Sequence, residues 1–238
     1  MDIAILLLVL LAVVASFAVS ASAGFGGSLI LVPALALLLG SKSGVALAAL
    51  LLAGNNVMKV VAYRRSMPYR RAAPIIAMMV VATAIGAALF VAAPERVVTG
   101  AVIVTFALTF LAERIDLKGL RRFGAPILAL ASGATSGFSG TSGPLKGLAM
   151  RTLQLDRVHL VGALSLGSLV GDATKASIFA EAGLISRNGF YFAIAAIPLM
   201  IGSTYLGRRI NSRVSELGFT RLFWAVMAGY TTRLLVTM

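Results

Sequence analysis

The sequence predicts an all-α polytopic membrane protein made of two inverted-topology repeats, each with a broken, re-entrant helical hairpin followed by transmembrane helices. Three observations predict this fold: the composition, the spacing of the apolar segments, and the placement of basic residues between them. Of the 238 residues, 59% belong to the set AVILMFWYC and 12% are charged, whereas soluble domains contain about 45–50% apolar and about 25% charged residues. This composition excludes an ordinary soluble enzyme. Once the chain is divided into membrane spans of about 20 residues, no room remains for a separate catalytic domain.

Ten apolar segments follow one another along the chain, and two neighbouring pairs contain members too short to cross a bilayer. A Gly/Ser-rich stretch interrupts each of these pairs, so we expect each pair to be a hairpin that returns to the side from which it entered. Asp2 stands where a signal peptide carries basic residues, which favours a retained first helix. The segments are 3–22, 28–40, 44–62, 74–93, 97–112, 125–137, 143–153, 158–178, 189–206 and 219–236; the broken pairs are 3–22 with 28–40, and 125–137 with 143–153.

Basic residues between the segments set the predicted orientation. A net charge of +13 in a soluble protein would indicate a nucleic-acid partner, but here the positive-inside bias explains the charge, and we expect no nucleic acid. We assign to the cytoplasm the loops with Arg64, Arg65, Arg70, Arg71, Arg114, Lys118, Arg121, Arg122, Lys146, Arg151, Arg157, Arg208, Arg209, Arg213 and Arg221, and to the other side those with Lys42, Arg96, Arg187 and Arg233. The chain then divides into a first transmembrane repeat at 1–112, a cytoplasmic linker at 113–124 and a second repeat at 125–238, within one membrane domain.

The two halves share landmarks that predict the repeat. The stretch 24–28 (GFGGS) is similar to 137–141 (GFSGT), and both lie at the break of a hairpin. Lys59 and Lys175 each lie near the end of the next long segment, but the loop after Lys59 is strongly basic and the equivalent loop 180–188 is not. Equivalent loops are therefore expected on opposite faces of the membrane, as in secondary transporters whose inverted halves surround one site near the midplane. The alternative is a chance match, because membrane helices reuse small residues for packing.

The hairpin breaks are the first candidate binding elements. The second break contains four hydroxyl side chains in nine residues, directly before a short helix that Pro144 can begin. A helix N-terminus presents free N–H groups and a partial positive charge, so two such ends that meet at the midplane can bind an anion without a metal; close packing through small residues is the alternative. The candidates are Gly26, Gly27 and Ser28 in the first break, and Ser139, Gly140, Thr141 and Ser142 in the second.

Polar residues inside the apolar segments are the second group of candidates. A charged side chain within a span costs at least ~2.5–3.5 kcal/mol on insertion scales, so it usually faces a bundle interior or an aqueous path. Lys59 and Lys175 either offset the charge of a substrate or extend to the interface from nearby helix ends. Asp172, three residues before Lys175 on the same helical face, either neutralises that lysine or couples transport to protons. Asn55 and Asn56 either line the same pocket or hold neighbouring helices together.

Sequence patterns of catalysis and of metal binding are missing. The chain contains no Cys and one His, and it has neither a Ser/His/Asp arrangement nor a GxxxxGK[ST] phosphate-binding loop. We therefore expect no enzyme activity, no catalytic residue, no metal and no cofactor.

These motifs together resemble those of the sulfite exporter TauE/SafE family of membrane permeases. The resemblance is carried by 23–28 (AGFGGS) followed by Pro33, by the Gly-rich stretch 133–143 with GFSG at 137–140, and by the two-half layout, and it covers essentially the whole chain. It implies a multi-pass secondary transporter that moves a small sulfur-containing anion, such as sulfite, sulfoacetate or another organosulfonate, across the bacterial inner membrane. A passive small-anion channel and a purely structural membrane protein remain alternatives. The expected partners are the anion and membrane lipid, and a homodimer is left open.

Overall fold

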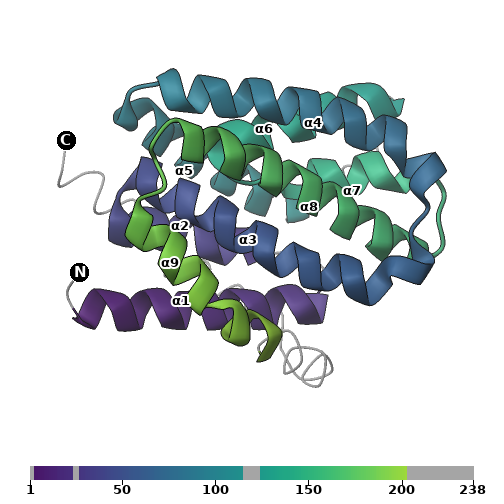
Figure 1. Ribbon diagram of the computed structural model, residues 1–238. Coiled ribbons are helices and arrows are strands. Elements are labelled where there is room, and N and C mark those ends of the chain that lie inside the picture. The colour runs from purple at the N-terminus through teal and green to yellow at the C-terminus, as the bar shows by residue number, and fades with distance from the viewer. Residues whose placement is uncertain (1–2, 24–26, 115–123, 203–238) are drawn as a thin grey trace.

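The computed structural model describes residues 3–23, 27–114 and 124–202, and the regular elements in these ranges are all helices (Figure 1). Nine of the ten predicted apolar segments each overlap a helix, which agrees with the predicted all-helical class, although segment 189–206 is interrupted at Ala196. Segment 219–236 and the last residues of segment 189–206 lie outside the described residues. The helices are α1 (Ile3–Ala23), α2 (Gly27–Leu39), α3 (Ser41–Tyr63), the 3-10 helix η1 (Arg64–Ser66), α4 (Tyr69–Ala92), α5 (Glu95–Arg114), α6 (Gly124–Ser139), α7 (Gly143–Arg151), α8 (Arg157–Glu181) and α9 (Arg187–Ala195).

The helix ends follow local sequence signals. Asp156 and Ser186 are the N-caps of α8 and α9, and their side chains accept hydrogen bonds from backbone N–H groups of the first turns, which such caps do wherever free N–H groups begin a helix. Pro94 separates α4 from α5, because a proline restricts the residue before it to extended conformations. Gly183 ends α8 with φ +72°, a left-handed conformation that suits glycine.

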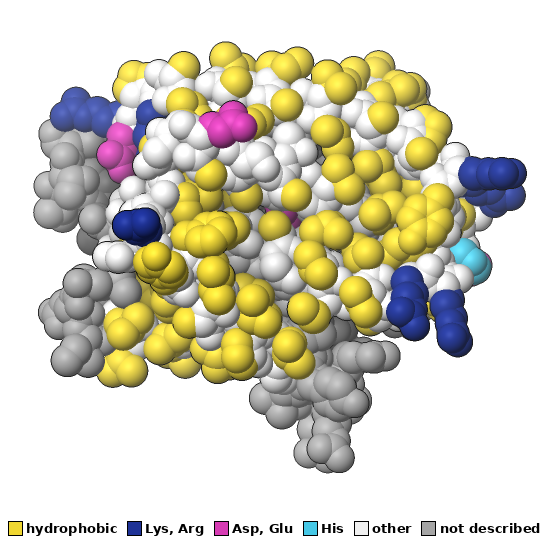
Figure 2. Space-filling view, in the orientation of Figure 1, with side chains coloured by type: hydrophobic (Ala, Val, Ile, Leu, Met, Phe, Trp, Pro, Cys, Tyr) yellow, Lys and Arg dark blue, Asp and Glu magenta, His cyan; other side chains and the backbone are white. Residues whose placement is uncertain are grey.

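The outer surface of the helices is apolar. The stretches Ser41–Ser66 and Tyr69–Ala92 are long and apolar enough to cross a membrane. On α4, Val81, Ile85 and Leu89 are each more than half exposed. Figure 2 shows hydrophobic side chains over the middle of the visible face, with Lys and Arg gathered at its two ends. An apolar band between charged ends is typical of helices that face lipid, so the fold is consistent with a membrane protein.

The two broken segment pairs form helical hairpins whose tips meet inside the bundle. Helix α1 packs on α2, and α6 packs on α7. In Figure 1, the α2 arm lies toward the end of the bundle where α3 begins, and the α7 arm lies toward the end where α3 leads into α4. At the tips, the hydroxyl oxygens of Ser28 and Thr141 are 3.1 Å apart. Gly140 lies against the side chains of Val32 and Val45.

Helices α4 and α6 pack backbone against backbone. A Cβ atom on Gly133 would fall 2.2 Å from the carbonyl oxygen of Met79, and a Cβ on Gly137 would fall 2.3 Å from that of Thr83. Such close approach is typical of membrane helix pairs with small residues at the interface. It fixes α6, and the break at its end, against α4.

Helices α3 and α8 pack side by side and run in opposite directions (Figure 1). The start of α8 lies beside the end of α3, because a Cβ on Gly162 would fall 2.7 Å from the carbonyl oxygen of Ser66. Helix α9, which follows α8, begins near the start of α3, where Gly189 lies near the side chain of Leu47. This pair of helices carries the buried polar side chains described next.

Candidate functional site

One face of α8 carries a line of polar side chains through the bundle. Ser165, Ser168, Asp172 and Lys175 are spaced by three and four residues, a spacing that places side chains on one face of a helix. Lys175 is 0% exposed, Ser165 3% and Asp172 9%. Because the bundle around them is apolar, these groups need partners inside the protein.

Asp172 is at the centre of this line. Its Oδ1 lies 2.7 Å from Nζ of Lys175, one turn further along α8. Its Oδ2 accepts a hydrogen bond of 2.7 Å from Nδ2 of Asn56 on α3. The structure therefore places Asp172 in an ion pair with Lys175, as one of its two predicted roles requires, and Asn56 links α3 to that pair.

Lys175 ties α8 to the second hairpin break. Besides its contact with Asp172, its ammonium group donates hydrogen bonds of 3.2 Å to Oγ of Ser136 and of 3.2 Å to the carbonyl oxygen of Gly140. Gly140 adopts φ +82°, which glycine reaches without the strain that a Cβ would cause. Since an ammonium group has three protons, these three acceptors match its donors, and in this conformation Lys175 holds the break in position.

Two other lysines lie on the opposite side of Asp172 along the helix pair. Lys146 on α7 donates a hydrogen bond of 2.6 Å to Oγ of Ser168, one turn before Asp172 on α8. Lys59 is one turn beyond Asn56 on the antiparallel α3, is 9% exposed, and interacts electrostatically with Lys146 and Asp172. Lys146 likewise interacts with the charges of Asp172 and Lys175. The structure thus gathers three lysines around one aspartate.

The assignment of Lys146 to a cytoplasmic loop is wrong. Lys146 lies in the first turn of α7 and is partly buried against α8. It is therefore close to the hairpin tip inside the bundle, not in the connection to α8. The sequence contained a signal for this position, because Lys146 follows the predicted break by only a few residues. Ser136 and Ser168, the hydrogen-bond partners of the lysines, were likewise not among the predicted site residues.

The remaining predicted residues lie around the hairpin tips and on α3. Gly27 is the first residue of α2, and its carbonyl oxygen accepts a 2.6 Å hydrogen bond from Oγ of Ser16. Ser139 donates to the carbonyl oxygen of Thr135 at 2.7 Å, a bond along its own helix. Ser142 is the N-cap residue of α7 and makes no capping hydrogen bond with its side chain. Asn55 is fully buried on α3, and Gly26 lies outside the described residues.

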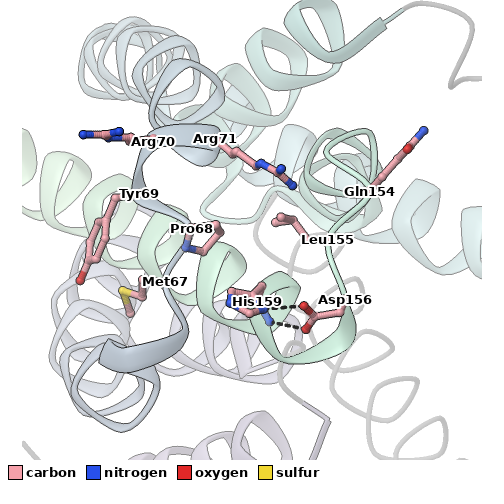
Figure 3. A pocket seen from close by; sticks show the side chains of 9 residues that line it. All are labelled: Met67, Pro68, Tyr69, Arg70, Arg71, Gln154, Leu155, Asp156 and His159. Carbon is pink, nitrogen blue, oxygen red and sulfur yellow. Dashed lines mark hydrogen bonds and ion pairs between the residues drawn. The ribbon is translucent and has the colours of Figure 1, made fainter.

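A separate pocket of about 600 Å³ opens at the end of the bundle where α3 leads into α4 (Figure 3). This is the basic end of the bundle, because Arg64, Arg65, Arg70 and Arg71 lie there. The pocket is lined by residues 67–68 between η1 and α4, by the first residues of α4 (69–71), by residues 154–156 before α8, and by His159 in the first turn of α8. In Figure 3, the side chain of Arg71 points toward Leu155 and that of Arg70 points away. A basic surface raises the local concentration of anions, so the two arginines of this pocket attract anions to this end of the bundle.

Asp156 organises one side of this pocket. Its Oδ1 accepts hydrogen bonds from the backbone N–H groups of Val158 at 3.0 Å and His159 at 3.1 Å, and its Oδ2 lies 2.5 Å from Nδ1 of His159. The backbone N–H of His159, then its side chain, hold the pKa of the Asp156 carboxyl below its usual value, with a smaller contribution from the N–H of Val158. This cap fixes the start of α8 next to the connection from α7.

Among the described residues, no group of three or more His, Cys, Asp or Glu could hold a metal ion.

Comparisons with known proteins agree with a transport role. No curated protein and no solved structure matches the chain. The family model described as sulfite exporter TauE/SafE matches residues 8–234, and the proteins of this family are membrane transporters rather than enzymes. The chain therefore belongs to the sulfite exporter TauE/SafE family.

Proposed function

We propose that the protein is a secondary transporter that carries a small sulfur-containing anion, such as sulfite, sulfoacetate or another organosulfonate, across the bacterial inner membrane by alternating access. Family membership supports membrane transport of a sulfur-containing anion. The observation that carries the proposal is the cluster of the buried Lys59 and Lys175 and the partly buried Lys146 around Asp172. Because cationic groups inside a membrane protein are expensive, they usually mark the path of a substrate or an ion.

The inverted repeat is part of this proposal, and two contacts support it. Ser28 and Thr141 are 113 positions apart, which is the offset between the two GF motifs. Asn56 and Asp172 are 116 positions apart, which is the offset between Lys59 and Lys175. At a two-fold axis a residue contacts its own equivalent, so both contacts fit a pseudo-two-fold axis that relates 1–112 to 125–238, with 113–124 as the linker.

The proposed orientation places the basic end of the bundle in the cytoplasm. Without Lys146, fourteen basic residues remain in the loops assigned to the cytoplasm, against four in the other loops, so the bias persists. The anion then approaches from this end of the bundle and first meets Lys59 and Lys146, while Lys175 and the second break lie beyond Asp172. This order suits export, in which the substrate is loaded from the cytoplasmic side.

Asp172 is the proposed coupling group. As a carboxylate it attracts Lys175 and accepts a hydrogen bond from Asn56. Protonation removes the counter-charge of Lys175, the lysine that holds the second break, and weakens the hydrogen bond that Asn56 on α3 donates to the carboxyl group. A proton that moves through this carboxyl would link the pH gradient to the change of access.

The experiment is a counterflow assay with purified protein in liposomes. Vesicles preloaded with unlabelled sulfite are diluted into a trace of radiolabelled sulfite, and a carrier accumulates the label transiently. We expect Lys59→Gln to abolish this accumulation, and Lys42→Gln to leave it unchanged, because Lys42 donates to the carbonyl oxygen of Val91 away from the cluster. A passive channel would give equilibration without accumulation, and a structural protein would give no flux; either result contradicts the proposal.

A further inference from the structure

The pocket at the basic end of the bundle lies between segments from the two halves of the sequence. Residues 67–71, before and in the first turn of α4, line one side of it, and residues 154–156 with His159 at the start of α8 line the other. Its volume of about 600 Å³ is within the range of about 300–1,000 Å³ that is typical of small-molecule sites. The lysine cluster around Asp172 contributes none of these lining residues, so the pocket is separate from the proposed transport site.

The α4 side of the pocket is positively charged. In Figure 3, the guanidinium group of Arg71 points into the pocket toward Leu155, and that of Arg70 points away from it. Asp156, the carboxylate among the lining residues, accepts hydrogen bonds from backbone N–H groups at the start of α8 and lies 2.5 Å from Nδ1 of His159. Its negative charge is thus held at the start of α8, on the other side of the pocket. Because a guanidinium group binds phosphate oxygens through two parallel hydrogen bonds, the α4 side suits a phosphate group.

The pocket lies at the depth of phospholipid headgroups. The two stretches that are long and apolar enough to cross a membrane are Ser41–Ser66, which ends at its edge, and Tyr69–Ala92, which begins there. Headgroups lie where such spans leave the hydrocarbon core of a bilayer. The lining also contains the apolar side chains of Met67 and Leu155. An amphipathic lining at this depth suits the headgroup and glycerol backbone of a lipid better than a fully hydrated ion.

An apolar stripe leads away from the pocket along the outside of α4. The exposed residues Arg70, Pro74, Ala77, Val81 and Ile85 follow one another at intervals of three and four. This spacing places them on one face of the helix, with Arg70 at the basic end. Val81 and Ile85 are each 58% exposed, and the shorter Pro74 and Ala77 leave space next to Arg70. The stripe therefore offers an acyl chain a continuous apolar surface that begins at an arginine.

We propose that this pocket binds the phosphate group of an anionic phospholipid, with Arg71 inside the pocket, Arg70 at its rim and an acyl chain along the stripe on α4. Basic pockets between transmembrane helices bind acidic headgroups in this way. A zwitterionic phospholipid binds less tightly, because its own ammonium group is repelled by the two arginines. The bound lipid connects the start of α4 with the start of α8, and the site does not depend on which anion the protein transports.

The test compares two phospholipids that have the same acyl chains and different headgroups. Phosphatidylglycerol has a net negative charge, and phosphatidylcholine is zwitterionic. Each is titrated into the purified full-length protein in a neutral detergent, and native mass spectrometry resolves the protein with no lipid, one lipid and more lipids bound. We expect the first phosphatidylglycerol to bind at least about tenfold more tightly than the first phosphatidylcholine. Glycerophosphoglycerol, the same headgroup without acyl chains, should not bind at the concentration at which phosphatidylglycerol saturates the protein.

The variants then assign the preference to the pocket. We expect Arg71→Gln to weaken the first phosphatidylglycerol about tenfold and to change phosphatidylcholine less than about threefold. Arg96→Gln is the matched control, because Arg96 is also an exposed arginine in the first turn of a helix, α5, which begins at the opposite end of α4. This control should leave both affinities unchanged.

Three results overturn the inference. Equal binding of the two lipids to the unchanged protein contradicts the preference for an anionic headgroup. The same result in Arg71→Gln and Arg96→Gln, whether a loss or no change, contradicts binding in this pocket. Binding of glycerophosphoglycerol as tight as that of the lipid makes the pocket a site for soluble phosphate esters. The first and third comparisons need no variant, so they decide the inference even where Arg71→Gln does not fold, and none of the three measures transport.

Discussion

The ion pair between Asp172 and Lys175 allows a quantitative prediction about stability. The side chains are 12% and 1% exposed, and the charged atoms are 2.7 Å apart. Replacement of Asp172 leaves Lys175 as an uncompensated charge in a buried site, which destabilises proteins by about 3–5 kcal/mol. Replacement of Lys175 is milder, because Lys59 and Lys146 still act on the charge of Asp172. Asp172→Asn should therefore lower the free energy of unfolding by an amount in this range, and Lys175→Met by a smaller amount that still exceeds about 1 kcal/mol.

The double variant tests whether this loss comes from the pair itself. With both charges removed, neither partner is left unpaired, so Asp172→Asn combined with Lys175→Met should be about as stable as the milder single variant. The two single effects should then fail to add by at least about 2 kcal/mol, within the range of coupling energies of residues in direct contact. Unfolding in mixed detergent micelles, titrated with a denaturing detergent and followed by circular dichroism, measures all four proteins.

Additive single effects would refute this reasoning, since they would mean that the two charges do not stabilise each other. Single effects below about 1 kcal/mol, the size typical of exposed ion pairs, would also refute it, because they would mean that water reaches the pair. Lys42→Gln serves as the reference for loss of a lysine that donates a hydrogen bond to the carbonyl oxygen of Val91 rather than to a carboxylate.

Three further predictions follow from other parts of the molecule. Gly137→Ala should destabilise the protein by about 1–3 kcal/mol, as over-packing does, whereas Gly147→Ala, with nothing within 4 Å of its Cβ, should be neutral in the same unfolding assay. The carboxyl of Asp156 should titrate below its ordinary pKa of 3.8 in a carbon-13 NMR titration; its cap on α8 is present above that value and is lost as the pH falls through the lowered pKa. Single cysteines at Lys42 and Leu155 should react with an impermeant maleimide from opposite sides of the membrane in whole cells, and labelling of both from one side would contradict the proposed topology.

The sequence was sufficient to predict the helices, because their signals are local. Apolar segment lengths and the Gly-rich breaks set most helix bounds within a few residues of those observed, whereas the predicted segment 189–206 is interrupted at Ala196, where α9 ends. The pairing of Asp172 with Lys175 could also be predicted from the sequence, because a spacing of three residues brings two side chains together on any helix. The hairpin tips could be located, since short segments cannot cross a bilayer.

Partners that come from other helices could not be predicted. The hydrogen bonds from Asn56 to Asp172 and from Lys146 to Ser168 join residues 116 and 22 positions apart, and no local spacing indicates them. The position of Lys146 was misjudged because it was assigned to a loop by its charge alone. The short distance in sequence between Lys146 and the second break indicated better that Lys146 lies inside the bundle.

The glycine contacts between α4 and α6 constrain how the transporter can change shape. Helix α4 belongs to the first half of the sequence and α6 to the second, yet their main chains touch at Gly133 and Gly137. Two helices joined so tightly cannot slide past each other without first separating, so they must travel as one piece. In the proposed alternating-access cycle, each moving body therefore contains helices from both halves of the chain, and a truncated protein that ends at the linker would lack part of one moving body.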